Sequence, residues 1–338
     1  MKFDSRKKES IKMYLLEKIK RNTKSLSKCV SDAFDINQNT VHNYINELEQ
    51  MEIIKRVRRG EYKLVSKEYS FIFKKNDGEL ESDSRIYKES LERLVDNFAP
   101  NVSEIWNYAF TEMVNNVIDH SQAEELSVLV EQDFLETSVF IKDDGVGIFN
   151  KIMRHFEMDS VEDAICELFK GKLTTDKSRH SGEGIFFTSR MVDDFAILSS
   201  GKIFAHNKYD DSEIFDARLK DGRGTAVIMK LSNFSKKEAG EVFSKFETEN
   251  GDFRITKIPL KNIFEKSPIS RSQAKRVSNR FCEFSQITLD FLGIDWMGQG
   301  FAHELFVVYK NSHPEIEIIP INMSEGVEKM YNHVVLGK

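Results

Sequence analysis

Three polar residues spaced four positions apart, Glu112, Asn116 and His120, are the first sign of chemistry in this sequence. They lie in residues 103–121, where the spacing of apolar side chains predicts a helix. Residues four apart project from one helical face, so we expect the three side chains to lie together. A carboxylate can act as a general base, and an amide oxygen is a ligand that Mg²⁺ accepts. Taken alone, the segment also fits a polar helix face with His120 as a cap.

Two glycine pairs are the next candidates for chemistry. The first, Asp143-x-Gly145-x-Gly147, follows a strand-like run and places a carboxylate beside a tight backbone turn. The second, Gly182-x-Gly184, leads straight into a helical pattern. Because the first N–H groups of a helix have no intrahelical partners, glycines at its start favour the binding of an anion.

The elements that must position these residues are short strands separated by helical segments. Helical patterns cover residues 103–121 and much of an insertion at 150–180. Apolar or alternating runs predict strands at residues 69–75, 126–133, 137–143, 195–200, 202–207, 213–219 and 222–231.

The order of these motifs resembles the gyrase, histidine kinase and MutL superfamily of ATP-binding domains, known as the Bergerat fold. The resemblance covers a domain at residues 68–235. It rests on Glu-x-x-x-Asn in a helix, Asp-x-Gly-x-Gly after a strand, Gly-x-Gly into a helix, and Gly-Thr on a strand. It implies an α/β sandwich, a mixed sheet with helices on one face, that binds ATP and Mg²⁺.

The resemblance also implies roles for single residues. Asp143 would accept a hydrogen bond from the adenine amino group, and Asn116 would coordinate Mg²⁺. Glu112 would be the catalytic residue that orients or deprotonates a water or hydroxyl. Lys177, with Arg179 and His180, would contact the γ-phosphate from the insertion. The implied cofactor-binding residues are Asn116, Asp143, Gly145, Gly147, Lys177, Gly182, Gly184 and Thr225.

The sequence departs from the histidine kinases at two points. No helical hairpin with a phosphorylated histidine precedes the domain, and Asp119 stands where many of those kinases have lysine. The Glu112, Asn116 and His120 pattern is closer to the anti-sigma-factor serine kinases. The phosphate-loop motif of other nucleotide-binding proteins is absent from the sequence.

A basic segment precedes this domain. Residues 1–66 contain 15 Lys/Arg against 9 Asp/Glu, whereas the remainder carries a net charge of −12. Helical patterns at residues 10–21, 25–34 and 40–54, the second with an N-cap at Ser25, are followed by a hairpin signal around Gly60. This order resembles the winged helix-turn-helix family and indicates a DNA-binding domain at residues 1–67.

The third helix and the hairpin supply the candidate DNA-binding residues. Short polar side chains can reach base edges, and arginines can contact the phosphate backbone. The candidates are Gln38, Asn39, Thr40, His42, Asn43, Arg56, Arg58 and Arg59, accompanied by Asn37 and Lys55. A winged helix that makes only protein contacts is the alternative.

The tail at residues 250–338 alternates strands and helices, which predicts a small α/β domain. The run around "LDFLGIDWMGQGFAHEL" resembles STAS-like domains related to anti-sigma-factor antagonists. Gly298, Gln299 and Gly300 stand where those proteins have Asp-Ser-Ser, so the phosphorylated serine is missing. Two interpretations of this turn remain open: the tail docks on the ATP domain or another protein, or Gly298–Gly300 is a plain strand–helix turn. Trp296 and Met297 are expected in its core.

Composition limits the remaining possibilities. The 338 residues indicate a multidomain α+β protein with a net charge of −6. Cys29, Cys166 and Cys282 fit neither a disulfide framework nor a zinc motif. We find no apolar run of about 20 residues and no signal-peptide core, so a cytoplasmic protein without membrane contact is expected.

Three functions remain open from the sequence. The first is a cytoplasmic, DNA-binding transcriptional regulator that binds Mg·ATP and uses the ATP domain and the STAS-like domain as a nucleotide-gated switch. The second is a serine/threonine protein kinase of the anti-sigma-factor type, with Glu112 as its base. The third is an ATPase whose turnover drives a homodimeric clamp.

Overall fold

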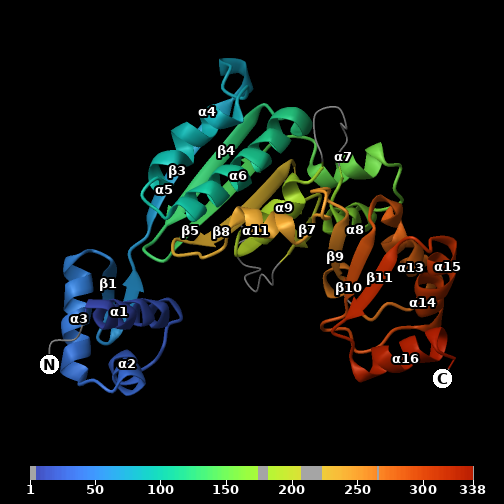
Figure 1. Ribbon diagram of the computed structural model, residues 1–338. Coiled ribbons are helices and arrows are strands. Elements are labelled where there is room, and N and C mark those ends of the chain that lie inside the picture. The colour runs from blue at the N-terminus through green and yellow to red at the C-terminus, as the bar shows by residue number, and fades with distance from the viewer. Residues whose placement is uncertain (1–4, 174–181, 207–222, 265, 338) are drawn as a thin grey trace.

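The computed structural model describes residues 5–173, 182–206, 223–264 and 266–337, which form three units along the chain (Figure 1). None of the helices in these ranges is long and apolar enough to cross a membrane. The first unit contains α1 (Ser5–Lys20), α2 (Leu26–Phe34), α3 (Gln38–Gln50), and an antiparallel hairpin of β1 (Ile54–Arg58) and β2 (Glu61–Leu64).

Local capping and an apolar stripe explain α3. The side chain of Asn37 accepts a hydrogen bond of 2.8 Å from the Asn39 N–H, which caps the helix. Val41 and Ile45 recur at helical spacing and are buried in the core of this unit. The predicted cap at Ser25 is wrong. Its backbone is left-handed (φ 53°) rather than extended, and its side chain accepts no hydrogen bond from α2.

The second unit is built on a six-stranded sheet. Its strands are β3 (Lys67–Lys74), β4 (Glu125–Gln132), β5 (Glu136–Asp143), β6 (Asp194–Ser199), β7 (Lys202–Ala205) and β8 (Thr225–Ser232). Their order across the sheet is β3-β4-β5-β8-β6-β7. The strand predicted at residues 213–219 lies outside the described residues.

The expected mixed sheet is wrong for the described strands, because every pairing in this sheet is antiparallel. The cause is the position of β8. The strands β5 and β6 run in the same direction, as a helical crossover between them requires. They do not pair with each other because β8 lies between them, antiparallel to both.

Helices cover one face of this sheet (Figure 1). They are α4 (Asp83–Tyr87), α5 (Arg93–Val95), α6 (Pro100–Asn116), α7 (Ile148–His155), α8 (Val161–Lys170), α9 (Gly184–Met191) and α11 (Ala239–Ser244). Side chains alternate along each strand, so Ile141 of β5 packs under the helices while Phe140 faces the opposite side. The same alternation places Asp143 and Thr225 on the helix-covered face.

The third unit has a parallel sheet of three strands. It contains β9 (Ile255–Pro259), α12 (Leu260–Ile263), α13 (Arg271–Ser278), β10 (Gln286–Asp290), α14 (Gln299–His303), α15 (Lys310–Ser312), β11 (Glu317–Ile321) and α16 (Glu325–Val335). The strand β10 lies between β9 and β11. Met297 is buried as expected, whereas Trp296 is 48% exposed. The prediction for Trp296 is wrong because the residue lies in the loop between β10 and α14.

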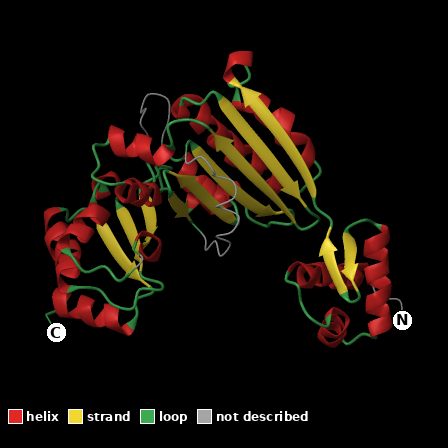
Figure 2. Cartoon of the chain, turned by 180° about the vertical axis from the view of Figure 1, so that it is seen from behind, coloured by secondary structure: helices red, strands yellow, loops and turns green. Residues whose placement is uncertain are grey.

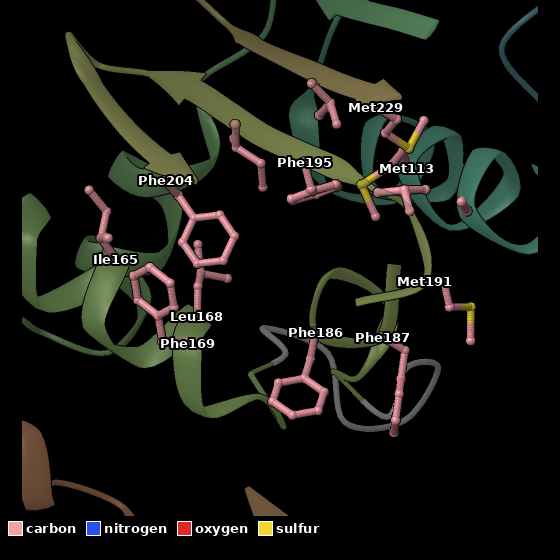
Figure 3. Packing of buried hydrophobic residues seen from close by; sticks show 14 of the residues in the cluster. Met113, Ile165, Leu168, Phe169, Phe186, Phe187, Met191, Phe195, Phe204 and Met229 are labelled. Atoms are coloured by element: carbon pink, nitrogen blue, oxygen red, sulfur yellow. The ribbon is translucent and has the colours of Figure 1, made fainter. Parts of the chain in front are cut away.

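The helix α8 lies where the second and third units meet. Ile165, Leu168 and Phe169 are packed in the core with Phe204 of β7, and the rings of Phe169 and Phe204 are 4.5 Å apart (Figure 3). The helix also contacts β9, α12 and α13 of the third unit. The second and third units therefore share one continuous hydrophobic core, which includes this helix.

The first unit is attached at the other end of the sheet. Leu135, in the turn between β4 and β5, is buried in the core of the first unit. Lys20 of α1 forms an ion pair of 2.9 Å with Glu136. The first and third units therefore lie at opposite ends of the central sheet, as the view from behind also shows (Figure 2).

Candidate functional site

A pocket of about 210 Å³ lies between the helix-covered face of the sheet and the helices α6, α7 and α9. It brings together motifs that are more than 100 residues apart in the sequence. All the described residues predicted for this site line the pocket except Gly145: Glu112, Asn116, Asp143, Gly147, Gly182, Gly184 and Thr225. Lys177, Arg179 and His180 lie outside the described residues.

The helix α6 supplies one wall of the pocket. Glu112, Asn116 and His120 all line it, which confirms that their spacing places them on one side. Ala109, in the next turn toward the N-terminus, is completely buried under the sheet. The segment Val117–Ser121 continues α6 as a π-helical turn and carries His120 to the end of the wall.

Asp143 forms the floor of the pocket at the end of β5. It is only 3% exposed, and its Oδ1 accepts a hydrogen bond of 2.8 Å from the Gly145 N–H. Burial raises the pKa of Asp143 to about 6, and this effect exceeds that of the hydrogen bonds from Gly145 and Thr225. The site thus holds a buried carboxylate that can accept a hydrogen bond from a ligand.

Close backbone approach explains the first glycine pair. A Cβ on Gly145 would lie 2.2 Å from the Ser121 carbonyl oxygen, so only glycine fits against the end of α6. Gly147 has φ +81°, and a Cβ there would lie 2.7 Å from Ser199 Oγ. Gly145 therefore shapes the turn from outside the pocket, whereas Gly147 also lines the pocket.

The second glycine pair lies opposite, at the start of α9. Gly182 has φ +75°, and its carbonyl oxygen accepts a hydrogen bond of 3.0 Å from the Leu173 N–H. Gly184 is the first residue of α9, and a Cβ there would lie 2.0 Å from Glu112 Oε2. The Glu112 carboxylate therefore lies at the N-terminal end of α9, the position that the sequence predicts for an anion.

Thr225 joins the floor of the pocket to α7. Its Oγ1 accepts a hydrogen bond of 3.0 Å from the Ile148 N–H, and its hydrogen bonds to Asp143 lower the pKa of that carboxyl group. The preceding Gly224 has φ +75°, and a Cβ there would lie 2.0 Å from the Asp143 carbonyl oxygen. The Gly-Thr motif therefore keeps β8 close to the end of β5.

Sequence reasoning missed Lys151 on α7. It lines the pocket, and its Nζ donates a hydrogen bond of 2.8 Å to the His120 carbonyl oxygen. The signal was present, because Lys151 follows Gly147 by four residues in the helix that this glycine begins. Within the described ranges, no group of three or more His, Cys, Asp or Glu side chains could hold a metal ion.

The candidate DNA-binding residues lie on α3 and on the hairpin of the first unit. Thr40 is half-buried, and the other residues of the predicted set are exposed. A groove of about 710 Å³ runs between the hairpin, α3 and the start of α2, and includes Gln38, His42 and Arg59. Asn37 uses its side chain as a helix cap, and Arg58 forms an ion pair with Glu61.

The predicted STAS-like position is the start of α14. Gly298 is the N-cap residue, followed by Gln299 and Gly300 in the helix. A Cβ on Gly298 would lie 2.4 Å from the Ile269 carbonyl oxygen, so the backbone here is packed tightly against the loop before α13. No hydroxyl side chain occupies these three positions.

Comparison with known proteins identifies part of the third unit. A family described as "STAS-like domain of unknown function (DUF4325)" matches residues 273–328. The match begins in α13 and ends in α16, so it includes β10, β11 and the Gly298–Gly300 turn. No curated protein matches the chain. The C-terminal unit therefore carries a STAS-like domain.

Proposed function

We propose that this protein is a cytoplasmic transcriptional regulator that binds Mg·ATP in its second unit and DNA through residues 1–67. In this proposal the second unit is a Bergerat-type ATP-binding domain and the first is a winged helix-turn-helix. The observation that carries the proposal is the meeting of Glu112, Asn116 and Asp143 with the Gly182–Gly184 turn in one pocket.

The chemistry of the pocket fits a nucleotide. Asp143 is a buried acceptor suited to the adenine amino group, and Asn116 offers an amide oxygen to Mg²⁺. The start of α9 at Gly184 favours phosphate. At about 210 Å³ the pocket is smaller than the ~300 Å³ or more of typical ligand sites. In this proposal it holds the base, and the phosphates lie toward the start of α9.

The contact between α8 and the STAS-like unit supports a nucleotide-gated switch. Lys170 is completely buried, and its Nζ donates to Glu167 Oε1 (2.6 Å) and to the carbonyl oxygens of Arg276 (3.2 Å) and Asn279 (2.7 Å). Arg280 contacts the other Glu167 oxygen at 3.3 Å. A buried ion pair is costly unless each of its polar groups has a partner. We therefore expect this network to hold the STAS-like unit in one position against α8.

The pocket and this network share a continuous piece of chain. Leu168 and Gly171 line the pocket, and Lys170 between them holds the STAS-like unit. Thr256 of β9 adds a hydrogen bond of 2.8 Å to the Lys170 carbonyl oxygen. A nucleotide that shifts residues 168–171 would shift the docked unit with them. Such coupling requires that ATP bind the two docking states with different affinity.

The first unit supports the DNA-binding part of the proposal. Arg59 of the hairpin and the polar side chains of Gln38 and His42 on α3 border the same groove. In this proposal α3 contacts base edges, while Arg56 and Arg59 contact the phosphate backbone.

The position of Glu112 keeps an enzymatic alternative open. Its carboxylate lies beside Gly184, at the proposed phosphate end of the pocket, where a base could activate water or a protein hydroxyl. A kinase would transfer label from ATP to a STAS protein that bears serine. A clamp ATPase would form dimers only with nucleotide.

The first experiment follows γ-labelled ATP with purified full-length protein and Mg²⁺. We expect the wild type to bind ATP and Asp143→Asn to lose binding, while Glu112→Ala keeps it. Phosphate release that disappears in Glu112→Ala would identify an ATPase, and binding without release would identify a ligand-gated protein. Absence of ATP binding by the wild type would refute the proposal.

The second experiment measures retention on DNA with and without Mg·ATP. We expect retention that falls steeply with salt and changes when nucleotide is added. Retention that is the same with and without nucleotide would exclude the switch. Absence of retention at low salt would exclude DNA binding.

A further inference from the structure

The pocket contains two carboxylates, yet its proposed ligand is a polyanion. Glu112 and Asp143 both contribute acidic groups to the lining. Among the lining residues within the described ranges, Lys151 is the only lysine or arginine. A cationic side chain gives phosphate a strong, charge-assisted hydrogen bond, so the position of this ammonium group bears on which ligand the pocket accepts.

The start of α7 fixes the position of Lys151. Gly147 begins the helix against Ser199, and its carbonyl oxygen accepts the first helical hydrogen bond, of 3.1 Å, from the Lys151 N–H. The Ile148 N–H is bound to Thr225 Oγ1 on the pocket floor. Lys151 stands one turn beyond these anchors and on the same side of the helix, so its side chain projects along the pocket wall.

The Lys151 ammonium group reaches across to α6. Its Nζ donates to the His120 carbonyl oxygen at 2.8 Å, four residues beyond Asn116. Neither α6 nor the π-helical turn that follows it at Val117–Ser121 contains a lysine or an arginine, so this wall has no cationic side chain of its own next to Asn116. The helix α7 therefore supplies a cation to the wall that carries Asn116.

We infer that Lys151 binds the phosphate chain of the nucleotide and makes the pocket selective for adenosine polyphosphates over adenosine. This inference rests on the proposed nucleotide binding. The hydrogen bond to the His120 carbonyl oxygen holds the ammonium group at the pocket wall that also carries Asn116. A phosphate group takes a charge-assisted hydrogen bond from the same Nζ.

The test compares the affinities of adenosine, ADP and ATP by calorimetry, with Mg²⁺ and the full-length chain. Lys151→Met is expected to weaken ATP and ADP binding about 10- to 100-fold and to leave adenosine binding unchanged. Lys151→Arg keeps the positive charge and is expected to retain most of the ATP affinity. Lys142→Met is the matched control, because Lys142 is next to Asp143 but projects from the opposite face of β5.

The outcomes distinguish the role of Lys151 from the proposed nucleotide binding itself. If Lys151→Met binds ATP like the wild type, the inference is wrong and the proposed nucleotide site stands. An equal loss for adenosine and ATP would mean that Lys151 only maintains the shape of the pocket, which also overturns the inference. If Lys151→Met does not fold, Lys151→Gln provides the same comparison. A wild type that binds neither adenosine nor ATP would refute the proposed function itself.

Discussion

The carboxylate of Glu112 occupies the space beside Gly184, where a Cβ would lie 2.0 Å from Glu112 Oε2. Gly184 begins α9, so the carboxylate lies where the helix carries partial positive charge. A phosphate that binds at this end of α9 would have to displace the carboxylate. Glu112, the candidate catalytic residue, therefore lies next to Gly184, a candidate anion-binding residue.

This contact predicts a coupled effect of two substitutions on stability. Gly184→Ala is expected to lower the free energy of unfolding by about 1–3 kcal/mol, because the new methyl group overpacks against Glu112. In a Glu112→Ala background the same change is expected to be neutral or slightly stabilising, because alanine favours a helix over glycine by up to about 1 kcal/mol. Urea denaturation of the four proteins of the cycle measures the coupling.

Gly240→Ala is the control for this cycle. Gly240 lies in α11, and a Cβ there would meet no atom within 4 Å. Its substitution should have the same small effect in both backgrounds. An equal loss of stability from Gly184→Ala with and without Glu112 would show that the clash lies elsewhere.

The buried Asp143 predicts a pH dependence of stability. Its pKa rises from 3.8 to about 6 on folding, so between these values the folded chain holds a proton that the unfolded chain has released. The contribution of Asp143 to the stability of the wild type should fall as the pH rises from about 4 to about 6, by on the order of 3 kcal/mol in total, and no further above that.

Asp143→Asn removes this titration but keeps an oxygen acceptor for the Gly145 N–H. Its stability relative to the wild type should therefore increase across the same pH interval and stay level at higher pH. Chemical denaturation of both proteins at pH 4, 5, 6, 7 and 8 checks this. If the stabilities of the two proteins changed with pH in the same way, the pKa of Asp143 would not be raised by folding.

The ion pair between α8 and the STAS-like unit predicts a large effect of Lys170→Met. The substitution leaves Glu167 buried with the longer Arg280 contact and a hydrogen bond of 3.0 Å from Asn279 Nδ2 as its remaining partners. We expect a loss of about 3 kcal/mol in docking or unfolding, at the low end for a buried pair because Arg280 remains. The double variant Lys170→Met/Glu167→Leu should recover most of this loss.

The two tryptophans allow this effect to be followed in each unit separately. Trp106 is completely buried in the second unit and Trp296 lies in the third. Single-tryptophan variants, with phenylalanine at the other position, report whether Lys170→Met separates the unfolding of the two units. If both probes still unfold together at the wild-type midpoint, the network contributes little to docking.

The hairpin arginines predict unequal effects on DNA retention. Arg58 is paired with Glu61, whereas Arg59 forms no ion pair with any residue that the structure describes and borders the groove beside α3. Arg59→Ala should weaken binding and reduce the slope of log affinity against log salt by about 1. Arg58→Ala should have a smaller effect, since its charge is already compensated. Equal losses of DNA affinity in the two variants would indicate that the hairpin acts through its overall positive charge rather than through contacts of individual arginines with phosphates.

Local patterns predicted the elements of this protein and much of the candidate site. The 3.6-residue period placed Glu112, Asn116 and His120 on one wall, and the strand predicted from the apolar run before Asp143 ended at that residue as expected. Both signals are confined to a single element, where spacing along the chain determines which side chains share a face.

Features that depend on several elements were not predictable in this way. Nothing local to β8 indicates that it pairs with both β5 and β6, so the sheet was expected to be mixed. The burial of Lys170 and Glu167 depends on a partner surface more than 100 residues away. Lys151 was overlooked because its relevance depends on the meeting of α7 with the end of α6.

The central position of β8 in the sheet determines when the pocket can form during synthesis. This strand is the last of the six in the chain, yet it lies between β5 and β6 and carries Thr225 to the pocket floor. Until residue 232 has emerged from the ribosome, β5 and β6 lack the strand that lies between them, and the pocket lacks the part of its floor that carries Thr225. The core of the first unit uses Leu135 from the β4–β5 turn, so this unit can be completed as soon as that turn has emerged. A nascent chain should therefore complete its first unit well before the pocket of the second unit is complete.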